Sequence, residues 1–404
     1  MQCRIDKKQI RNFLTIRYNP LDRPITRPAN WRDFQQTESD LDGNTTEKIL
    51  RESITTLLGE KDGTISISLS SGIDSTLSLE LLRKVFPNRK IVAICAIFEG
   101  GFDESEIAKK VAEKHDADFK TLHMDSLFVN MPEIIYISKR PKWNTYTHLV
   151  AKEAKKSSDV LVTGDGADEL FGGYTFRYDK FLNLLNSKDD SQQKVIKYLE
   201  CHDRDWVPDQ PKLFGSSIKF QWYQIYRYFK PWFMNALSPL QQVMLADFNG
   251  KLLYDFIPTG RSICNHYKLK GAPIFLYSKL VNYAMHLPIE QKYDHKNKLG
   301  KLVLRKITKR LGIMHLDEKI GFSPNLFVDW KKHGREICRS YLLDKNANIF
   351  RQKLINYRWV IKAFERVEND GDLRYLNRLI SILALEIWYR MFFTKEINRF
   401  QRLS

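Results

Sequence analysis

The sequence predicts an α/β fold, a doubly wound parallel sheet followed by a largely helical C-terminal half. Between Glu47 and Tyr178, short apolar runs suited to strands alternate with segments of helical periodicity. The run 91–98 is apolar on both faces, as expected of a strand that helices cover on both sides. After Tyr178, strand-like runs disappear and apolar residues recur at helical spacing. Such alternation is typical of a parallel sheet, here of about five strands.

The predicted elements follow a regular order along the chain. A helix over 49–58 precedes a strand over 65–69, and the next helix, 77–85, stops before Pro87, which cannot continue it. The rest of the first half should contain strand 91–98, helix 104–114, strand 121–124, helix 148–155 and strand 160–163. In the second half we expect helices over 182–185, 240–253, 276–287, 302–311 and 374–402.

A loop of small polar residues, 68–76, joins the strand at 65–69 to its helix. Backbone N–H groups and the helix dipole converge at such a junction, where a phosphate can sit. Gly72 lets the backbone approach a ligand closely, and Asp74 can hold the magnesium ion that accompanies phosphates. Hydroxyl donors come from Ser70, Ser71 and Ser75. The spacing is neither that of the Walker A loop nor Gly-x-Gly-x-x-Gly, and a serine-rich turn that caps an ordinary helix is the alternative.

A second glycine-bearing loop, 164–174, follows the strand at 160–163 and reads GDGADELFGGY. Loops that follow parallel strands meet at the carboxyl edge of the sheet, so Asp74 and Asp168 should face one site. Two carboxylates that meet across phosphate oxygens suit magnesium, which prefers oxygen ligands. A solvated surface loop would explain either segment alone, but not the pair.

Three motifs, in order, resemble the asparagine synthetase family. Residues 70–75 are similar to the pyrophosphate loop of N-type ATP pyrophosphatases, and 164–174 resembles the second signature of asparagine synthetases. Residues 318–324, with Trp330 following, resemble the family's lysine-bearing loop. Weaker matches are 103–105, 111–112, 280–281, 287–288 and 300–305. The resemblance covers about residues 45–335 and implies an adenine nucleotide α-hydrolase-like fold of the ATP pyrophosphatase type.

The resemblance also implies which residues bind the nucleotide. The ATP phosphates would be held by the first loop, through Ser70, Ser71, Gly72, Asp74 and Ser75. The backbone around Leu69 and Ile97 would read the adenine, and Thr163 and Gly164 would line the nucleotide pocket.

The metal and catalytic residues are inferred in the same way. Asp74 and Asp168 would hold Mg²⁺, and Lys319 would be the catalytic lysine. Asp165, which stands where the family usually has Glu, is the second catalytic candidate.

The chemistry that this resemblance implies is carboxylate activation. A carboxylate attacks the α-phosphorus of ATP, pyrophosphate leaves, and ammonia or an amine captures the acyl-adenylate to give an amide and AMP. The expected function is therefore an ATP- and magnesium-dependent amide ligase that acts on aspartate or a related acid. Two alternatives stay open: a tRNA-modifying ATP pyrophosphatase, and a non-catalytic nucleotide-binding subunit that regulates or scaffolds.

The chain also departs from the family. Glutamine-dependent members begin, after Met removal, with a nucleophilic cysteine and a complete glutaminase domain, whereas Gln2 stands here at position 2. We expect residues 1–45 to be a short remnant of such a domain, in which 11–18 resembles at most its last strands, and 46–404 to be the synthetase-like domain. The nitrogen would come from free ammonia, an amine or a separate glutaminase subunit, without glutamine hydrolysis by this chain.

A further departure lies in residues 270–277, where the family reads EARVPFLD. Lys270, Ala272 and Tyr277 replace the acidic, basic and acidic residues of that motif. Because a changed set of charges changes which substrate a site prefers, the identity of the carboxylate stays open.

Composition limits the remaining choices. Hydrophobic residues make up 43% of the chain, which is ordinary for a globular protein. The five cysteines are scattered and form no Cys-x-x-Cys motif. The sequence shows no signal-peptide pattern, and no apolar run approaches the ~20 residues of a membrane span. These features favour a cytoplasmic protein.

The net charge of the chain indicates which kinds of partner it could bind. The net charge of +17 would suit a polyanion, and the aromatic residues within 186–230 could stack bases. We favour their packing in a helical layer, so nucleic acid binding is not the preferred expectation.

Overall fold

The computed structural model describes residues 6–59, 63–202, 207–316 and 324–404. Its central element is a five-stranded sheet in the order β3-β2-β1-β4-β5, in which every neighbouring pair is parallel. The strands are β1 (Ile65–Ser68), β2 (Ile91–Ile97), β3 (Asp118–His123), β4 (Val160–Thr163) and β5 (Lys270–Pro273). Strand order reverses between β1 and β4, where doubly wound sheets bind their ligands. The predicted fold class is confirmed.

Side chains of the central strands alternate between two hydrophobic cores. Ile91 and Ala93 of β2 pack into the core that includes α2 (Asn44–Leu58), α3 (Ile73–Val85) and α4 (Ser105–Lys114). Val92 and Ile94 pack into the opposite core, with α5 (Met131–Ser138), α6 (Thr147–Ala154) and α13 (Ile257–Tyr267). Burial on both faces explains why β2 is apolar throughout.

The second half of the chain is mostly helical, as predicted. Around the site are α7 (Ala167–Phe171), α8 (Thr175–Leu184), α14 (Ser278–His286), the short hairpin of β6 (Tyr293–Asp294) and β7 (Leu299–Gly300), and α15 (Leu302–Arg310). Helices α9 (Ser191–Glu200), α11 (Tyr223–Phe233) and α12 (Pro239–Asp247) pack together, and α12 continues into the π-helical segment η2 (Phe248–Phe256). The short α10 (Gln210–Leu213) packs instead in the core of the C-terminal helices.

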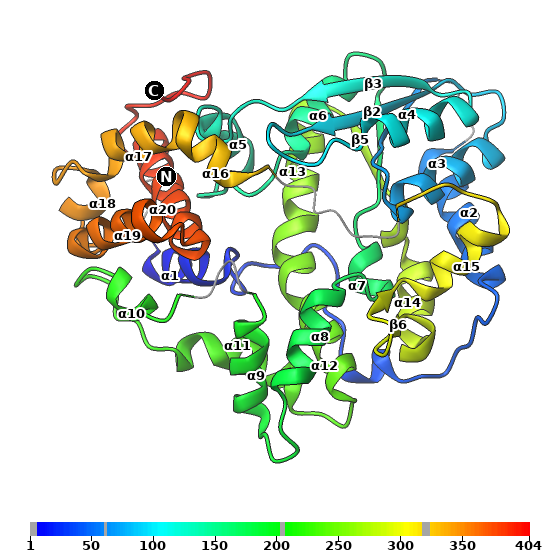
Figure 1. Cartoon of the computed structure of the whole chain (residues 1–404), viewed down its shortest axis with the longest axis horizontal. Coiled ribbons are helices and arrows are strands. Elements are labelled where there is room, and N and C mark those ends of the chain that lie inside the picture. Colours follow the sequence, from blue (N-terminus) through cyan, green and yellow to red (C-terminus); the bar gives the residue numbers. More distant parts are fainter. Residues whose placement is uncertain (1–5, 60–62, 203–206, 317–323) are drawn as a thin grey trace.

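The last helices form a separate group around α20 (Leu373–Phe392). They are α16 (Leu326–Asp329), α17 (Arg335–Leu342), α18 (Asn348–Arg351) and α19 (Tyr357–Asp370). Helix α1 (Lys7–Ile16) also packs against α20, far from α3 and α15 (Figure 1).

Several sequence expectations were wrong in detail. Residues 11–18, compared with strands, are mostly helix, because Asp6 caps α1 through the N–H groups of Lys8 and Gln9. The last helix ends at Phe392 rather than at 402, since the chain turns back there and Glu396 N–H donates to the Arg390 carbonyl. The division at residue 45 stays a prediction.

Most of the aromatic residues that the structure describes in 186–230 pack against a core, whereas Tyr223 is 58% exposed. Phe229 is buried, and Phe220, Trp222, Tyr226 and Tyr228 contact the same core. Packing in a helical layer, the favoured interpretation, therefore accounts for most of them. Of the described helices, none combines the length and apolar character needed to cross a membrane.

Candidate nucleotide site

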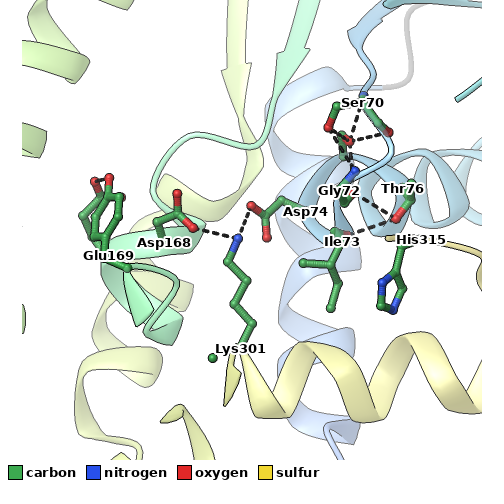
Figure 2. A network of polar contacts seen from close by, with 12 residues as sticks. Ser70, Gly72, Ile73, Asp74, Thr76, Asp168, Glu169, Lys301 and His315 are labelled. Carbon is green, nitrogen blue, oxygen red and sulfur yellow. Dashed lines mark hydrogen bonds and ion pairs between the residues drawn. The ribbon is translucent and has the colours of Figure 1, made fainter. Parts of the chain in front are cut away.

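The first loop joins β1 to the N-terminus of α3 and is braced by its own serines. The Ser75 hydroxyl accepts a hydrogen bond from the Ser70 N–H (3.0 Å) and lies 2.9 Å from the Ser70 hydroxyl. The Gly72 N–H donates to that Ser70 hydroxyl at 3.2 Å (Figure 2). Gly72 is the N-cap of α3, and no side chain in the described chain caps this helix. Backbone N–H groups and the helix dipole at this N-terminus favour an anion.

The second loop lies against the first. It runs from β4 into α7, and a Cβ added to Gly164 would lie 3.1 Å from the Asp74 Cβ. The Thr163 hydroxyl donates to the exposed Asp165 carboxylate at 2.8 Å. The structure thus brings Gly164 beside the first loop, with Thr163 preceding it at the end of β4.

Lys301 joins the two loops. Its ammonium lies 2.5 Å from Asp74 Oδ2 and 2.7 Å from Asp168 Oδ1 (Figure 2). The Lys301 side chain is 10% exposed and the two aspartates 22–23%, so water screens this triad only in part. Burial alone would lower the pKa of Lys301, but the two carboxylates outweigh it and raise the pKa above its ordinary value.

The backbone around this triad is fitted to it. Lys301 precedes α15 with a left-handed φ of 59°, and its N–H donates to the Phe171 carbonyl of α7 at 2.9 Å. A Cβ at Gly173 would fall 1.9 Å from Asp168 Oδ1 and 2.6 Å from the Lys301 Cε. Glycine is therefore required at position 173, where carboxylate and lysine pack directly on the backbone.

Glu169, next to Asp168, belongs to a buried network instead. It accepts a hydrogen bond from the Tyr174 hydroxyl at 2.6 Å, and Figure 2 shows it beyond Asp168 as seen from Lys301. Burial, and then the charge of Asp168, raise its pKa to about 7. Arg177 lies over the Tyr174 ring, 4.4 Å from its centroid, and pairs with the buried Asp247 at 2.5 Å. Through Glu169 and Tyr174, this buried network anchors the second loop to the protein interior.

The remaining expected residues lie at the same edge, with one exception. Leu69 follows β1, and Ile97 ends β2. The Leu69 N–H donates to the Ile94 carbonyl at 2.9 Å, and the Ile97 carbonyl accepts from the Met124 N–H at 2.9 Å. Contacts of these two residues with a base would therefore use their other backbone groups. Lys319 lies outside the described residues.

The two aspartates fit a magnesium ion that comes with phosphates. They already bracket one cation, the Lys301 ammonium, and they offer the oxygen ligands that Mg²⁺ prefers. The described residues contain no group of three or more His, Cys, Asp or Glu that could hold a metal alone. Phosphate oxygens and water would have to supply the other ligands.

Two residues of the site were missed in the sequence. Lys301 was part of a weak match, 300–305, but nothing in the pattern placed its ammonium between Asp74 and Asp168. Glu104, in the weak match 103–105, accepts hydrogen bonds from both the N–H and the hydroxyl of Ser71. Both contacts join residues distant in sequence, so only the fold reveals them.

Comparison with known proteins gives relatives of one kind. Asparagine synthetase [glutamine-hydrolyzing] 1 of Bacillus subtilis (strain 168) is 29% identical over 356 residues, which cover 80% of this chain and 55% of that protein. A putative asparagine synthetase [glutamine-hydrolyzing] of Mycobacterium bovis is 36% identical over 122 residues, or 28% of this chain and 18% of that protein. The chain thus spans about half the length, or less, of these relatives.

Among solved structures, an NH3-dependent NAD synthetase from Campylobacter jejuni is 16% identical, with 42% of this chain and 90% of that chain covered. Its TM-score of 0.24 is too low to carry weight, and the fold follows from the sheet itself. The family model of asparagine synthase matches residues 45–390. The chain therefore belongs to the asparagine synthase family.

Proposed function

We propose that this protein is an ATP-dependent ligase that adenylates a carboxylate and transfers ammonia or an amine to it, giving an amide, AMP and pyrophosphate. The observation that carries the proposal is the pair Asp74 and Asp168, which face one cation beside the uncapped start of α3. Family membership supports ATP-dependent ligation. The site supports the part of that chemistry in which a nucleotide is bound.

The phosphates of ATP would lie at the N-terminus of α3. Backbone N–H groups and the helix dipole favour negative charge there. Asp74 and Asp168 would hold Mg²⁺, which when bound shields the phosphates and polarises the P–O bonds. The Lys301 ammonium, which pairs with both aspartates, would be released to interact with phosphate oxygens if Mg²⁺ took its place beside the carboxylates.

The chemical step needs stabilisation of charge on the leaving group. One oxygen of the substrate carboxylate forms a bond to the α-phosphorus, and the bond from this phosphorus to the pyrophosphate oxygen breaks. The Lys301 ammonium and the N–H groups at the start of α3 would stabilise the departing charge. The amine then attacks the acyl carbon and AMP leaves with the carboxylate oxygen. Lys319 remains our candidate for the catalytic lysine, and Asp165 for a group that contacts the substrate.

The substrate is best described as aspartate or a related acid. Lys270 begins β5 and lies at the amino edge of the sheet, and Ala272 is fully buried within it. Tyr277, beyond the carboxyl end of β5, donates its hydroxyl to Glu52 at 3.1 Å. Of the three altered positions, Tyr277 is thus the one on the ligand side of the sheet, where it would change the choice of carboxylate.

Ammonia would be free or come from a separate glutaminase subunit. The cysteines at 95, 264 and 338 are free thiols, which suits the cytoplasm that we propose as the location.

The test is an assay of both products with a panel of carboxylates. Purified protein is incubated with ATP, Mg²⁺ and each acid, including aspartate, with and without ammonia, and AMP and pyrophosphate are measured. We expect equal amounts of the two, dependent on one acid of the panel, and an amide when ammonia is present. Pyrophosphate release that requires tRNA would point to the tRNA-modifying class instead. No release with any acid or RNA would indicate a nucleotide-binding subunit without catalysis.

A further inference from the structure

Ser71, in the middle of the first loop, is held by hydrogen bonds from outside the loop. Its N–H donates to Glu104 Oε2 at 2.9 Å, and its hydroxyl donates to the same oxygen at 2.6 Å. Its carbonyl accepts from the Leu316 N–H at 2.9 Å. The residue is 1% exposed. Ser71 was expected to bind phosphate, yet both of its donors are engaged by a carboxylate of the chain itself.

Glu104 does not serve the helix that it precedes. It is the N-cap of α4, but its side chain makes no capping bond to that helix. The neighbouring Asp103 does so instead, since it accepts from the Ser105 N–H at 2.9 Å. Hydrogen bonds from the Ser105 side chain and then from its N–H lower the pKa of Asp103. This division of roles leaves the Glu104 carboxylate for Ser71.

The other side of Ser71 is anchored as well. Leu316 follows His315, whose ring nitrogens lie 3.1 Å from the Thr308 hydroxyl of α15 and 3.2 Å from the Leu316 carbonyl. Ser71 thus lies between α4 and the segment after α15. Its N–H belongs to the peptide unit shared with Ser70 and its carbonyl to the unit shared with Gly72, so these two bonds hold both peptide units that flank Ser71.

We propose that Glu104 is a positioning residue of the nucleotide site, which orients the Ser71 peptide so that the first loop keeps the shape that receives pyrophosphate. The proposal rests on the proposed function, because it assumes that this loop binds ATP. A carboxylate beside a polyphosphate site would normally repel the ligand. Here two hydrogen bonds from Ser71 satisfy the Glu104 carboxylate.

Glu104→Ala removes the acceptor and leaves two donors of Ser71 without their partner. Without this acceptor the loop populates other conformations, and the measured Kd rises in inverse proportion to the fraction of molecules that can bind. We therefore expect the Kd for Mg²⁺ with a non-hydrolysable ATP analogue to rise about tenfold. Glu104→Gln keeps an acceptor oxygen, so its Kd should stay within about twofold. Glu104→Asp, which is one methylene shorter, should behave like Glu104→Ala.

The matched control is Asp103→Ala, which removes the cap of α4 but spares the contact with Ser71. Calorimetry measures the Kd of each variant, and hydrogen exchange of a peptide covering 69–76 is measured without nucleotide. Faster exchange and weaker binding in Glu104→Ala and Glu104→Asp, but not in Glu104→Gln or Asp103→Ala, would support the proposal. Equal Kd values for Glu104→Ala and wild type, or an equal loss in Asp103→Ala, would overturn it. The proposed function fails separately, if wild type does not bind the analogue at all.

Discussion

Lys301→Met offers the sharpest perturbation of the site. It keeps most of the side-chain volume but removes the ammonium, so that Asp74 and Asp168 face each other without a cation. Removal of one partner from a fully buried ion pair typically costs about 3–5 kcal/mol, whereas exposed pairs are worth about 0–1 kcal/mol. Because both aspartates are 22–23% exposed, we expect an intermediate loss of about 2 kcal/mol in the free energy of unfolding.

Magnesium should reverse this loss. In wild type the ammonium competes with the metal ion for the same carboxylate oxygens, so millimolar Mg²⁺ without ATP should stabilise Lys301→Met more than wild type. Urea unfolding with and without MgCl₂ measures both effects.

The control is Lys298→Met on the same hairpin, where the 62% exposed side chain pairs with Asp179 at 3.0 Å. Its loss should stay below about 1 kcal/mol. If Lys301→Met is as stable as Lys298→Met, or if Mg²⁺ stabilises wild type equally, the two aspartates do not form a shared cation site.

Three further predictions concern single residues. Glu169 has a pKa raised to about 7 from 4.5, so its contribution to stability is complete below pH 4.5 and is lost as pH rises to about 7. Relative to Glu169→Gln, wild type should lose about 1.4 kcal/mol per pH unit across that window in urea titrations, and parallel profiles would contradict this. Gly173→Ala should raise the Kd for Mg²⁺–ATP at least tenfold, because the added methyl group displaces the Asp168 carboxylate. An unchanged Kd in calorimetry would show that close packing of Asp168 on Gly173 does not matter for binding. Lys319→Ala should leave ATP affinity nearly intact but abolish amide formation, and unchanged turnover would remove Lys319 from the mechanism.

Local pattern was enough to predict the fold class but not every element. β2 was predictable because both of its faces are apolar. β5 was missed because its sequence, Lys-Gly-Ala-Pro, has almost no strand propensity. It is a strand because it pairs with β4 from Val160 to Thr163, at the edge of the sheet. Proline is tolerated on such an edge strand. That pairing depends on a connection of about a hundred residues, which no local signal reveals.

The site shows the same limit. Small residues and acids after strands led to both loops, and parallel topology brought Asp74 and Asp168 together. The sequence pattern did not indicate which residues neutralise the charges of Asp74, Asp168 and the first loop. Lys301 and Glu104 resemble ordinary surface residues in the sequence, and their roles arise from contacts with residues 33 or more positions away.

The acyl-adenylate is tested most directly by the fate of a carboxylate oxygen. The acid that supports pyrophosphate release is labelled with ¹⁸O in its carboxylate and is turned over with ATP, Mg²⁺ and ammonia, and the products are examined by mass spectrometry. Attack of the carboxylate on the α-phosphorus predicts one ¹⁸O in each AMP and none in pyrophosphate. Label in inorganic phosphate together with ADP, or AMP free of label, would contradict adenylation of the substrate at this site.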